Sequence, residues 1–473
     1  MLLVALASAF VMRSELSRLV GAEHVLDAPP GSPYNVDSSR RRGVVGHADA
    51  VVLPGSAEEV AAVLRWCYEH DVPLVARGGG TGLAGGAVAT QGGVVCSLER
   101  LRRVRELEPA LWRIFPEAGV TTRHVQRLAR ENGLFFGPDP GASEQSQIGG
   151  NVATNAGGPH ALKYGVTGAW VTGIEAVLAP GELVDLGGWA RKDVAGYDLR
   201  SLLIGSEGTL GVITAVRLRL LPAPEAAIAL VVFLSSRAAG CAAIRDVLAG
   251  GLRPSVLDFL DGETLAMLAA AYPAMAPGAD VEAAGVPGDA GFALIAEVDG
   301  TRDEAGAQRE ELLELLGAAA VAVHEPQDSE ALWRWREGVN PAVTSVRGGK
   351  VSGDVVFPLE RLEQGLEGFQ EIAERHGLRS CAWGHGGEGN VHATVLVDPG
   401  DERELDAAEA VSEELYALVV ALGGSIAGEH GVGWMKRGRL GSQWDRRAVE
   451  LHEEIKRAFD PKGLLNPETK LAR

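Results

Sequence analysis

Four glycine-rich segments in the first half of this 473-residue chain restrict its fold more than any other feature. They lie at residues 78–86, 137–141, 148–158 and 205–214. Glycine is unfavourable inside a helix, and its missing side chain lets the backbone approach a flat ligand closely. Four such segments in one region are more than turns require. The pattern therefore predicts that these segments together line one large, extended ligand.

Residues 80–85 match G-x-G-x-x-G after a predicted strand, which is the pattern of a Rossmann dinucleotide site. That fold requires a helix directly after the glycine loop, but Gly85, Gly86 and the pair Gly92-Gly93 lead into another predicted strand. The segment therefore predicts a nest of backbone N–H groups that can hold a pyrophosphate. A merely flexible glycine turn is the alternative.

Strand and helix signals alternate around these loops. Capping signals predict three helices: after Ser56–Glu59, from Thr121 or Thr122 to Gly133, and from Thr301–Glu304 to about Leu316. Apolar periodicity predicts strands at 73–77, 93–98, 174–178, 212–220 and 228–233. A domain boundary is expected at 222–226. The Pro- and Gly-rich stretch 273–291 predicts a surface loop.

Composition excludes several classes of protein. A net charge of −19 argues against a nucleic-acid surface. The four cysteines are far apart in the sequence, so the sequence predicts neither a disulfide framework nor an iron–sulfur cluster. This cysteine usage favours a protein that works in a reducing cytoplasm. The apolar start, residues 1–12, is shorter than a membrane span and predicts a helix that packs on the protein.

The second half contains a histidine motif of its own. Residues 384–394 read G-H-G-G-E-G-N-V-H-A-T, and residues 427–433 read A-G-E-H-G-V-G. His385, His392, Glu429 and His430 can bind a divalent metal or move a proton. The glycines between the first two histidines disfavour a helix, so a loop leading into a strand is expected. The alternative is that these groups only satisfy backbone atoms in a turn.

These motifs together resemble a known flavoprotein superfamily. R-G-G-G-T-G at 77–82, P-D-P-G, I-G-G-N-V-A-T-N-A-G-G, G-Y-D-L and G-S-E-G-T-L-G-V-I-T are similar to the FAD-binding domain of the vanillyl-alcohol oxidase and p-cresol methylhydroxylase superfamily. The histidine motifs and F-D-P-K-G-L-L-N-P resemble its D-2-hydroxyacid dehydrogenases, which include glycolate oxidase FAD subunits, D-lactate dehydrogenase and D-2-hydroxyglutarate dehydrogenase. The resemblance covers roughly residues 34–470.

The resemblance implies an α+β fold: a PCMH-type FAD-binding domain of two subdomains, plus a cap domain with an antiparallel sheet flanked by helices. The implied domain limits are a helical segment at 1–46, the FAD-binding domain at 47–224, the substrate and metal domain at 225–430, and a segment at 431–473 that returns to the FAD domain.

The resemblance also implies the residues that hold FAD. At the pyrophosphate these are Arg77, Gly78, Gly79, Gly80, Thr81 and Gly82. Lining the rest of the cofactor are Pro138, Gly141, Gly149, Gly150, Asn155, Gly157, Gly158, Glu207, Gly208, Ile213 and Asn466. The first loop contains no histidine for a covalent flavin link, so dissociable FAD is expected.

The implied reaction oxidises a D-2-hydroxyacid such as glycolate, D-lactate or D-2-hydroxyglutarate to the 2-oxoacid. A divalent metal held by His385, His392 and Glu429 lowers the pKa of the substrate hydroxyl, and the hydride goes to flavin N5. Zinc is the default for this ligand set, with manganese, iron or cobalt as alternatives. His430 corresponds to the family's base.

The remaining catalytic residues implied by the resemblance bind the substrate carboxylate. Arg336 and Lys350 match the family's clamping cations, with Arg347 as a rival. Two positions depart from the pattern: Asn340 stands where Thr or Ser is frequent, and Gly353 stands where an acidic residue often precedes the Asp. These departures bear on substrate identity more than on the type of reaction.

Electrons must leave reduced FAD for another molecule. An iron–sulfur subunit, an electron-transfer flavoprotein, a quinone and a cytochrome are all compatible acceptors, and a partner of this kind could hold the protein at a membrane. A homodimer is the expected oligomeric state. Two other functions remain open: a non-redox enzyme of the alkyl-dihydroxyacetone-phosphate synthase type, and a non-catalytic flavin-binding subunit of a glycolate oxidase.

Overall fold

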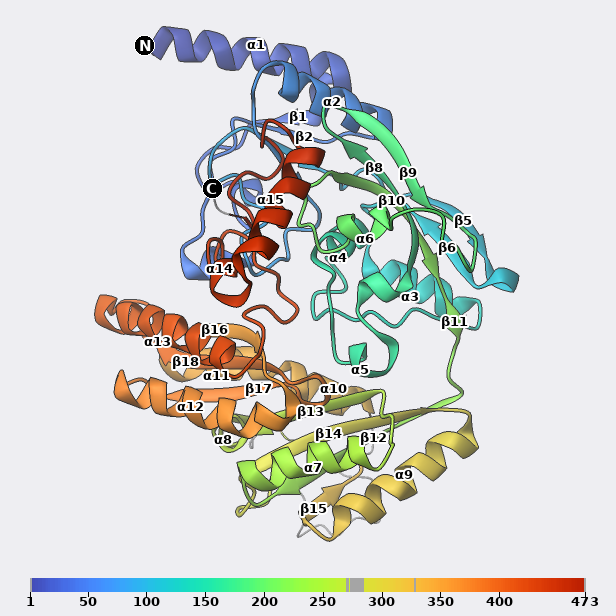
Figure 1. Ribbon diagram of the computed structural model, residues 1–473, viewed down its shortest axis with the longest axis vertical. Coiled ribbons are helices and arrows are strands. Elements are labelled where there is room, and N and C mark those ends of the chain that lie inside the picture. Colours follow the sequence, from blue (N-terminus) through green and yellow to red (C-terminus); the bar gives the residue numbers. More distant parts are fainter. Residues whose placement is uncertain (1, 269–271, 273–284, 327–328, 472–473) are drawn as a thin grey trace. The chain divides into compact units, whose positions relative to one another are not determined.

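The computed structural model describes residues 2–268, 272, 285–326 and 329–471 (Figure 1). Its contacts divide the chain into two units. Unit 1 contains Met1–Gly157, Gly165–Ala223 and Glu429–Arg473, and unit 2 contains Gly158–Tyr164 and Pro224–Gly428. The structure thus groups residues 1–46 with unit 1 and the segment 158–164 with unit 2, which differs from the predicted limits. Most of the predicted loop 273–291 lies outside the described residues.

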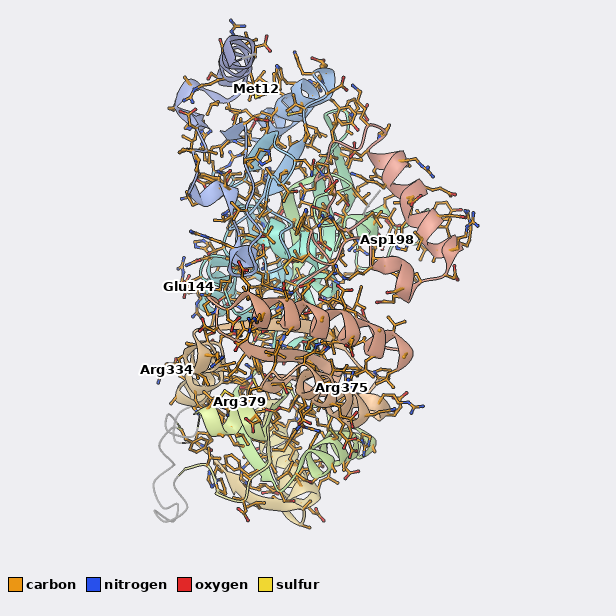
Figure 2. The ribbon with its side chains drawn as sticks, turned by 90° about the vertical axis from the view of Figure 1, so that its left-hand side faces the viewer. Met12, Glu144, Asp198, Arg334, Arg375 and Arg379 are labelled. Atoms are coloured by element: carbon orange, nitrogen blue, oxygen red, sulfur yellow. The ribbon has the colours of Figure 1, made fainter. Side chains whose placement is uncertain are left out.

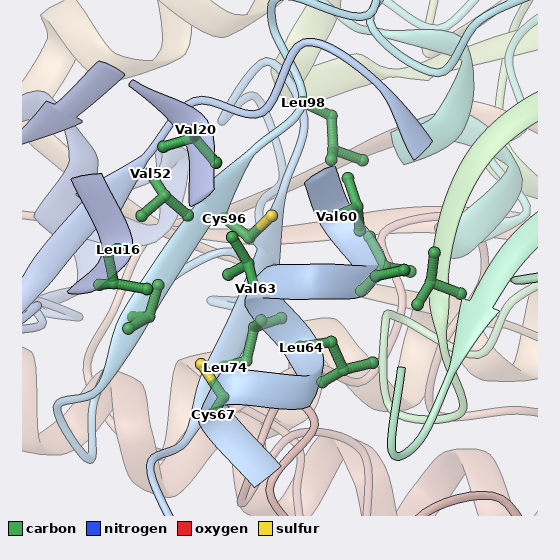
Figure 3. Close-up of a cluster of buried hydrophobic side chains, with 14 of the residues drawn as sticks. Leu16, Val20, Val52, Val60, Val63, Leu64, Cys67, Leu74, Cys96 and Leu98 are labelled. Atoms are coloured by element: carbon green, nitrogen blue, oxygen red, sulfur yellow. The ribbon is translucent and has the colours of Figure 1, made fainter. Parts of the chain in front are cut away.

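A four-stranded sheet and two helices form the first part of unit 1: α1 (Leu2–Val20), β1 (Val25–Leu26), β2 (Ala50–Val52), α2 (Ala57–Glu69), β3 (Leu74–Arg77) and β4 (Val94–Ser97). The strand order is β1-β2-β4-β3, with β2, β4 and β3 parallel and β1 antiparallel at the edge. Ser56 caps α2 as predicted. The buried face of α2 packs on the sheet, and Leu16 and Val20 of α1 join this core (Figure 3).

An antiparallel sheet of five strands forms the second part of unit 1: β5 (Val104–Glu108), β6 (Arg113–Pro116), β8 (Val171–Leu178), β9 (Glu182–Gly187) and β10 (Val212–Arg219). Their order is β5-β6-β10-β8-β9. The same part contains α3 (Thr122–Glu131), β7 (Leu134–Phe135), α4 (Ile148–Thr154), α6 (Leu199–Leu203) and β11 (Leu221–Pro222). Thr121 is the cap of α3.

The end of the described chain packs on the first sheet of unit 1. After α14 (Leu440–Gln443) and α15 (Arg446–Phe459), Leu465 forms a parallel bridge with Leu74 of β3. The Leu74 amide donates to the Leu464 carbonyl at 2.8 Å. Strand β3, which leads into the first glycine loop, is therefore held from both sides.

Unit 2 is built on one antiparallel sheet of seven strands: β12 (Ala226–Leu234), β13 (Val256–Asp261), β14 (Phe292–Gly300), β15 (Ala320–His324), β16 (Gly349–Val356), β17 (Ser380–His385) and β18 (Asn390–Val397). Their order is β15-β12-β14-β13-β17-β18-β16. Every neighbouring pair is antiparallel, so the predicted antiparallel sheet is confirmed.

Helices cover both faces of this sheet. On one face lie α7 (Arg237–Ala249), α9 (Arg302–Gly317), α12 (Leu362–Arg375) and α13 (Glu402–Ala421). On the other lie α5 (Ala161–Tyr164), α8 (Gly262–Leu268), α10 (Ser329–Glu337) and α11 (Val339–Arg347). The predicted capping box of α9 is present, with Thr301 and Glu304 bonded reciprocally. Within the described ranges, no helix has the length and apolar character needed to cross a membrane.

Candidate active site

The first glycine loop follows β3 and packs tightly against residues 145–150, at the start of the third glycine segment. Gly80 has φ +67, a left-handed conformation that favours glycine. A Cβ on Gly79 would overlap with the carbonyl oxygen of Gln145. Side chains at these two positions would therefore push the loops apart. Because glycines occupy these positions, a ligand can approach the backbone of this loop directly.

Arg77, predicted as a pyrophosphate contact, lies beneath the loop. Its terminal NH2 groups donate to the carbonyls of Pro33 at 2.9 Å and Ala87 at 3.1 Å. Burial lowers the pKa of this guanidinium, and the carboxylate of Asp37 opposes that effect. The guanidinium of Arg77 thus donates to backbone carbonyls that flank the glycine loop, and it stabilises the loop in this way.

Asn466 joins three segments of unit 1. Its amide nitrogen donates to the carbonyls of Gly86 at 2.7 Å and Glu207 at 2.8 Å, and its amide oxygen accepts from the Ala76 N–H at 2.9 Å. The side chain is 2% exposed. Asn466 therefore ties β3, the first glycine loop and the last glycine segment to one another.

Glu207 makes the second link to the C-terminal segment. Its carboxylate accepts from the backbone N–H groups of Val432 at 3.1 Å and Gly433 at 2.7 Å, and from the Lys470 ammonium at 3.1 Å. These contacts use both carboxylate oxygens. Glu207 and Asn466, both predicted to line FAD, thus hold the flavin loops in place through their side chains.

The other predicted flavin contacts follow the glycine segments. Gly149 donates to the Ala118 carbonyl and is packed against it, whereas Gly150 at the start of α4 faces open space. Asn155 ends α4 in the left-handed conformation, and its side chain accepts from the Gly168 N–H at 2.8 Å. Gly82 and Gly141 are exposed, and Gly158 belongs to unit 2. The remaining predicted contacts are buried or half-buried residues of unit 1: Gly78, Thr81, Pro138, Gly157, Gly208 and Ile213.

Two buried polar atoms near these loops have no hydrogen-bond partner among the described residues. They are Oε1 of Gln147, which precedes α4, and Oγ of Ser206 in the last glycine segment. Buried polar atoms are normally paired, so unused capacity at a ligand site indicates a polar ligand. Together with the open side of Gly150, these atoms fit a cofactor with polar groups along its length, as FAD has.

One face of the unit 2 sheet carries a row of polar and aromatic side chains from four adjacent strands. Asp354 of β16 lies opposite His392 of β18, and His392 lies opposite Trp383 of β17. His385, two residues further along β17, lies opposite Asp258 of β13. Directly opposite residues share a face. The rings of the two histidines meet edge to face with centroids 5.7 Å apart, and both are buried.

Asp258 lies at the β13 end of this row, and sequence reasoning missed it. Its Oδ1 accepts from Nδ1 of His385 at 2.7 Å and its Oδ2 from Nε of Arg336 at 2.8 Å, and it is fully buried. Burial alone would raise its pKa, but the charges of His385 and Arg336 outweigh it and hold the pKa at about 2. An Asp inside the apolar strand V-L-D-F-L-D is the signal that could have found it.

Arg336 and Arg334 lie on the same helix, α10, but face different surroundings. Arg334 points away from the sheet, is 64% exposed and pairs with Glu330 (Figure 2). Arg336 is 12% exposed and pairs with Asp258. The structure therefore places Arg336 at the row of polar side chains.

Lys350 reaches the same face from β16. Its ammonium lies 4.6 Å from the ring centroid of Trp383 and donates to Oδ1 of Asn340 on α11. The rival cation, Arg347, pairs instead with Glu404 and is half exposed. Asn340 therefore holds Lys350 over Trp383, which gives this departure from the family pattern a structural role.

Gly353, the second departure, belongs to the opposite face of the sheet. A Cβ at this position would lie 2.7 Å from Cδ2 of Leu415 on α13. An acidic side chain there would be directed into the helix packing and away from His392. This difference from the family therefore concerns packing in unit 2.

Asp354 holds the chain at the end of unit 2. Its Oδ1 accepts from the Asn390 amide at 2.9 Å and its Oδ2 from the Gly428 N–H at 3.0 Å. The next residue, Glu429, begins the last part of unit 1, where its Oε1 lies 3.6 Å from Nε2 of His430. The structure thus brings the two predicted histidine ligands together in unit 2, and Glu429 and the predicted base together in unit 1.

A second polar cluster in unit 2 was not predicted. Glu297 of β14 is buried and accepts from His160 at 2.9 Å and from the Trp333 indole at 3.1 Å. Asp299, two residues along, accepts from Lys163 and from the Tyr164 hydroxyl. These pairs attach the segment 158–164, which directly follows a glycine motif, to the sheet of unit 2.

Two family models match the chain. Residues 48–187 match the FAD binding domain, and residues 223–469 match the model described as FAD linked oxidases, C-terminal domain. The second match alone covers about half of the chain.

Curated relatives match over nearly the whole length. The chain is 33% identical to the glycolate oxidase subunit GlcD of Bacillus subtilis (strain 168), over 96% of each chain. It is 36% identical to the GlcD subunit of Escherichia coli (strain K12), over 88% of this chain and 82% of the relative. It is 34% identical to a D-lactate dehydrogenase of Archaeoglobus fulgidus, over 96% and 97%.

Solved structures share the fold. p-Cresol methylhydroxylase with substrate bound matches with a TM-score of 0.81 and 18% identity, over 98% of this chain and 97% of that one. Alkyldihydroxyacetonephosphate synthase matches with a TM-score of 0.74 and 18% identity, over 96% and 84%. At these identities the likeness concerns the fold alone. The glycine loops, the antiparallel sheet of unit 2 and the matches over the whole chain lead to one conclusion: the chain belongs to the FAD-linked oxidase family, with a PCMH-type FAD-binding domain and the family's C-terminal domain.

Proposed function

We propose that this chain oxidises a D-2-hydroxyacid to the 2-oxoacid with FAD as the hydride acceptor. The observation that carries the proposal is the row in unit 2, where His385 and His392 lie on one face of the sheet beside two cations, Arg336 and Lys350. Metal ligands next to fixed positive charges suit a substrate with a hydroxyl group beside a carboxylate. Relatives named glycolate oxidase subunit and D-lactate dehydrogenase support the same substrate class.

A divalent metal held by His385, His392 and Glu429 is part of the proposal, since each of the three offers one ligand atom. Two imidazoles and a carboxylate suit zinc, and manganese, iron or cobalt also fit such a set. When bound, the metal lowers the pKa of the substrate hydroxyl while FAD accepts the hydride at N5.

The chain's own residues bind the substrate and move its proton. Arg336 and Lys350 bind the carboxylate, because a buried carboxylate needs a cation. Asn340 and Trp383 hold the Lys350 ammonium in place. His430, next to the proposed ligand Glu429, takes the hydroxyl proton on a ring nitrogen.

FAD is held without a covalent bond by the glycine loops of unit 1. The backbone of residues 78–82 contacts the pyrophosphate, and Arg77, Glu207 and Asn466 keep the loops in position. Oε1 of Gln147 and Oγ of Ser206 offer unpaired polar atoms to the cofactor.

The electrons leave to a separate molecule. The four cysteines, at positions 67, 96, 241 and 381, are all free and buried, and burial raises the pKa of each thiol. Four separate, protonated thiols do not form a relay. We infer that an iron–sulfur subunit, an electron-transfer flavoprotein, a quinone or a cytochrome accepts the electrons. A stable iron–sulfur partner would appear as brown absorbance beyond flavin in the purified complex.

The test is anaerobic bleaching of the flavin band by a panel of D- and L-2-hydroxyacids, with and without chelator. We expect rapid bleaching by at least one D-acid, its loss after chelation and its return with added metal. Flavin that no hydroxyacid reduces would refute the proposal and favour a non-redox or non-catalytic flavoprotein. Bleaching that persists after complete metal removal would refute the metal's role.

A further inference from the structure

Asp258 contacts two residues that have different roles in the proposed reaction. One carboxylate oxygen accepts from Nδ1 of His385, a proposed metal ligand, and the other accepts from Nε of Arg336, a proposed substrate cation. The contacts are 2.7 and 2.8 Å long, and Asp258 has no exposed surface. The carboxylate therefore has one short hydrogen bond to each residue and no contact with solvent.

The contact with His385 decides which ring nitrogen can bind a metal. A carboxylate that pairs with Arg336 is an acceptor, so Nδ1 of His385 carries the proton. In the neutral imidazole the lone pair then lies on Nε2. A second hydrogen bond of this kind sets the tautomer and the ring direction of a metal-binding histidine. Asp258 thus prepares His385 for a metal through Nε2.

The contact with Arg336 decides which side of the guanidinium is left for a ligand. Asp258 takes the Nε–H, and no hydrogen bond of the two terminal NH2 groups is present among the described residues. The two NH2 groups form the edge that binds a carboxylate through two parallel hydrogen bonds. Because Arg336 is 12% exposed and anchored at Nε, this edge has a defined direction.

We propose that Asp258 is a positioning residue that couples the metal to the substrate carboxylate. One rigid carboxylate on β13 sets the direction of His385 and of Arg336 together, so the metal and the substrate's carboxylate are placed relative to one another. This inference rests on the proposed function. It predicts that Asp258 affects both the affinity for the metal and the KM for the hydroxyacid.

The test compares Asp258→Asn with Asp261→Asn in the full-length, FAD-loaded protein. Asp261 is a matched control: it lies on the same strand, is buried, and accepts backbone N–H bonds from Thr264 and Ala382 on the other face of the sheet. The affinity for Zn²⁺ alone is measured by competition with a chromophoric chelator. KM and kcat are measured separately with the D-acid that bleaches the wild type best.

We expect Asp258→Asn to weaken Zn²⁺ binding by about 10- to 100-fold, as loss of such a partner does at other metal sites. KM should rise about tenfold or more, because a single amide cannot replace a charge shared by two cations. Asp261→Asn should keep both constants within threefold of the wild type. If Asp258→Asn changed only the Zn²⁺ affinity or only KM, or changed neither relative to Asp261→Asn, the proposed coupling would be overturned.

The outcomes separate this inference from the proposed function. A wild type that no hydroxyacid reduces would end the proposed function, whereas unchanged Zn²⁺ affinity in Asp258→Asn would still overturn the inference by itself. A wild type that binds no Zn²⁺ but is reduced by a D-acid would overturn the inference and leave the proposed oxidation standing.

If Asp258→Asn does not fold, NMR of ¹⁵N-histidine-labelled wild type decides. The His385 signals, assigned with His385→Gln, should show a protonated Nδ1 before and after Zn²⁺ addition, with the change at Nε2. A neutral His385 whose single ring proton lies on Nε2 in the metal-free protein would refute the assigned role.

Discussion

Replacing Asn466 by Asp tests whether the C-terminal segment holds the flavin loops. The side chains have nearly the same volume, and both residues tolerate the left-handed backbone found here, φ +42, so neither packing nor backbone strain changes. The acceptor for Ala76 N–H remains. The two hydrogen bonds donated to Gly86 and Glu207 carbonyls, at 2.7 and 2.8 Å, are lost, and a carboxylate oxygen faces both carbonyls.

The magnitude follows from the loss of these two buried contacts. A buried acceptor left without its donor costs about 1–3 kcal/mol. Two such acceptors cost about 2–6 kcal/mol together, and even about 2 kcal/mol in the arrangement that binds FAD raises the FAD dissociation constant by roughly 30-fold. The main effect should therefore be a flavin that dissociates on dilution.

The assay is the recovery of flavin fluorescence on serial dilution of the holoprotein, together with the melting temperature. Asn132→Asp is the control, since Asn132 makes a single side-chain bond to the Leu128 carbonyl on an exposed helix end and receives the same added charge. An Asn466→Asp protein whose FAD dissociation constant stays within threefold of wild type would refute the reasoning.

Four further outcomes are expected. Gly79→Ala should lose FAD on dialysis, because the added Cβ overlaps with a backbone carbonyl, and retained flavin would contradict this. His392→Ala should keep its flavin spectrum yet bind less than a tenth of the wild-type metal by elemental analysis, since His392 lies in unit 2 and the glycine segments proposed to hold FAD lie almost entirely in unit 1. Gly353→Asp should lower the melting temperature without changing KM, because the position faces Leu415; an altered KM would contradict this. Burial raises the pKa of Asp261 from 3.8 to about 6, so the folded protein binds this proton more tightly than the unfolded chain. As the pH rises from 4 to 7, the wild type should therefore lose up to roughly 3 kcal/mol of its free energy of unfolding relative to Asp261→Asn. Urea unfolding of both proteins across this pH range measures the difference.

Local sequence signals predicted many of the elements well. Ser56, Thr121 and Thr301 cap the helices that their sequences predict. Such signals act within one turn of a helix, so they can be read without knowing the fold. The strand that contains His392 is also as predicted, because the glycines before it disfavour an α-helix and form only a single 3-10 turn at Gly386–Glu388.

Interactions between distant segments could not be read in this way. Asp258 is separated from Arg336 by 78 residues and from His385 by 127, and it reaches both only through strand pairing and helix packing. The attachment of residues 158–164 to Glu297 and Asp299 depends in the same way on strand β14. No local pattern marks these partners, apart from a charged residue within an apolar strand.

The roles of recognised residues also needed the tertiary structure. Motif similarity drew attention to Arg77, Glu207 and Asn466 as flavin residues, but their hydrogen bonds are to the protein's own backbone and, for Glu207, also to the Lys470 side chain. A sequence motif records that a residue belongs to a site and leaves open whether its side chain faces the ligand or supports the loop.

The sequence by itself determined which segments are glycine-rich, which residue types are available for a metal and a proton, and the flavoprotein family. Only the structure shows that one of these segments, 148–158, begins with the helix α4. The tertiary structure alone decided that His385, His392, Arg336 and Lys350 reach one face of one sheet, and that Asp258 lies between two of them. The physical reason is register: antiparallel pairing of strands far apart in the chain selects which side chains become neighbours, and the energy of burying their charges depends on those neighbours.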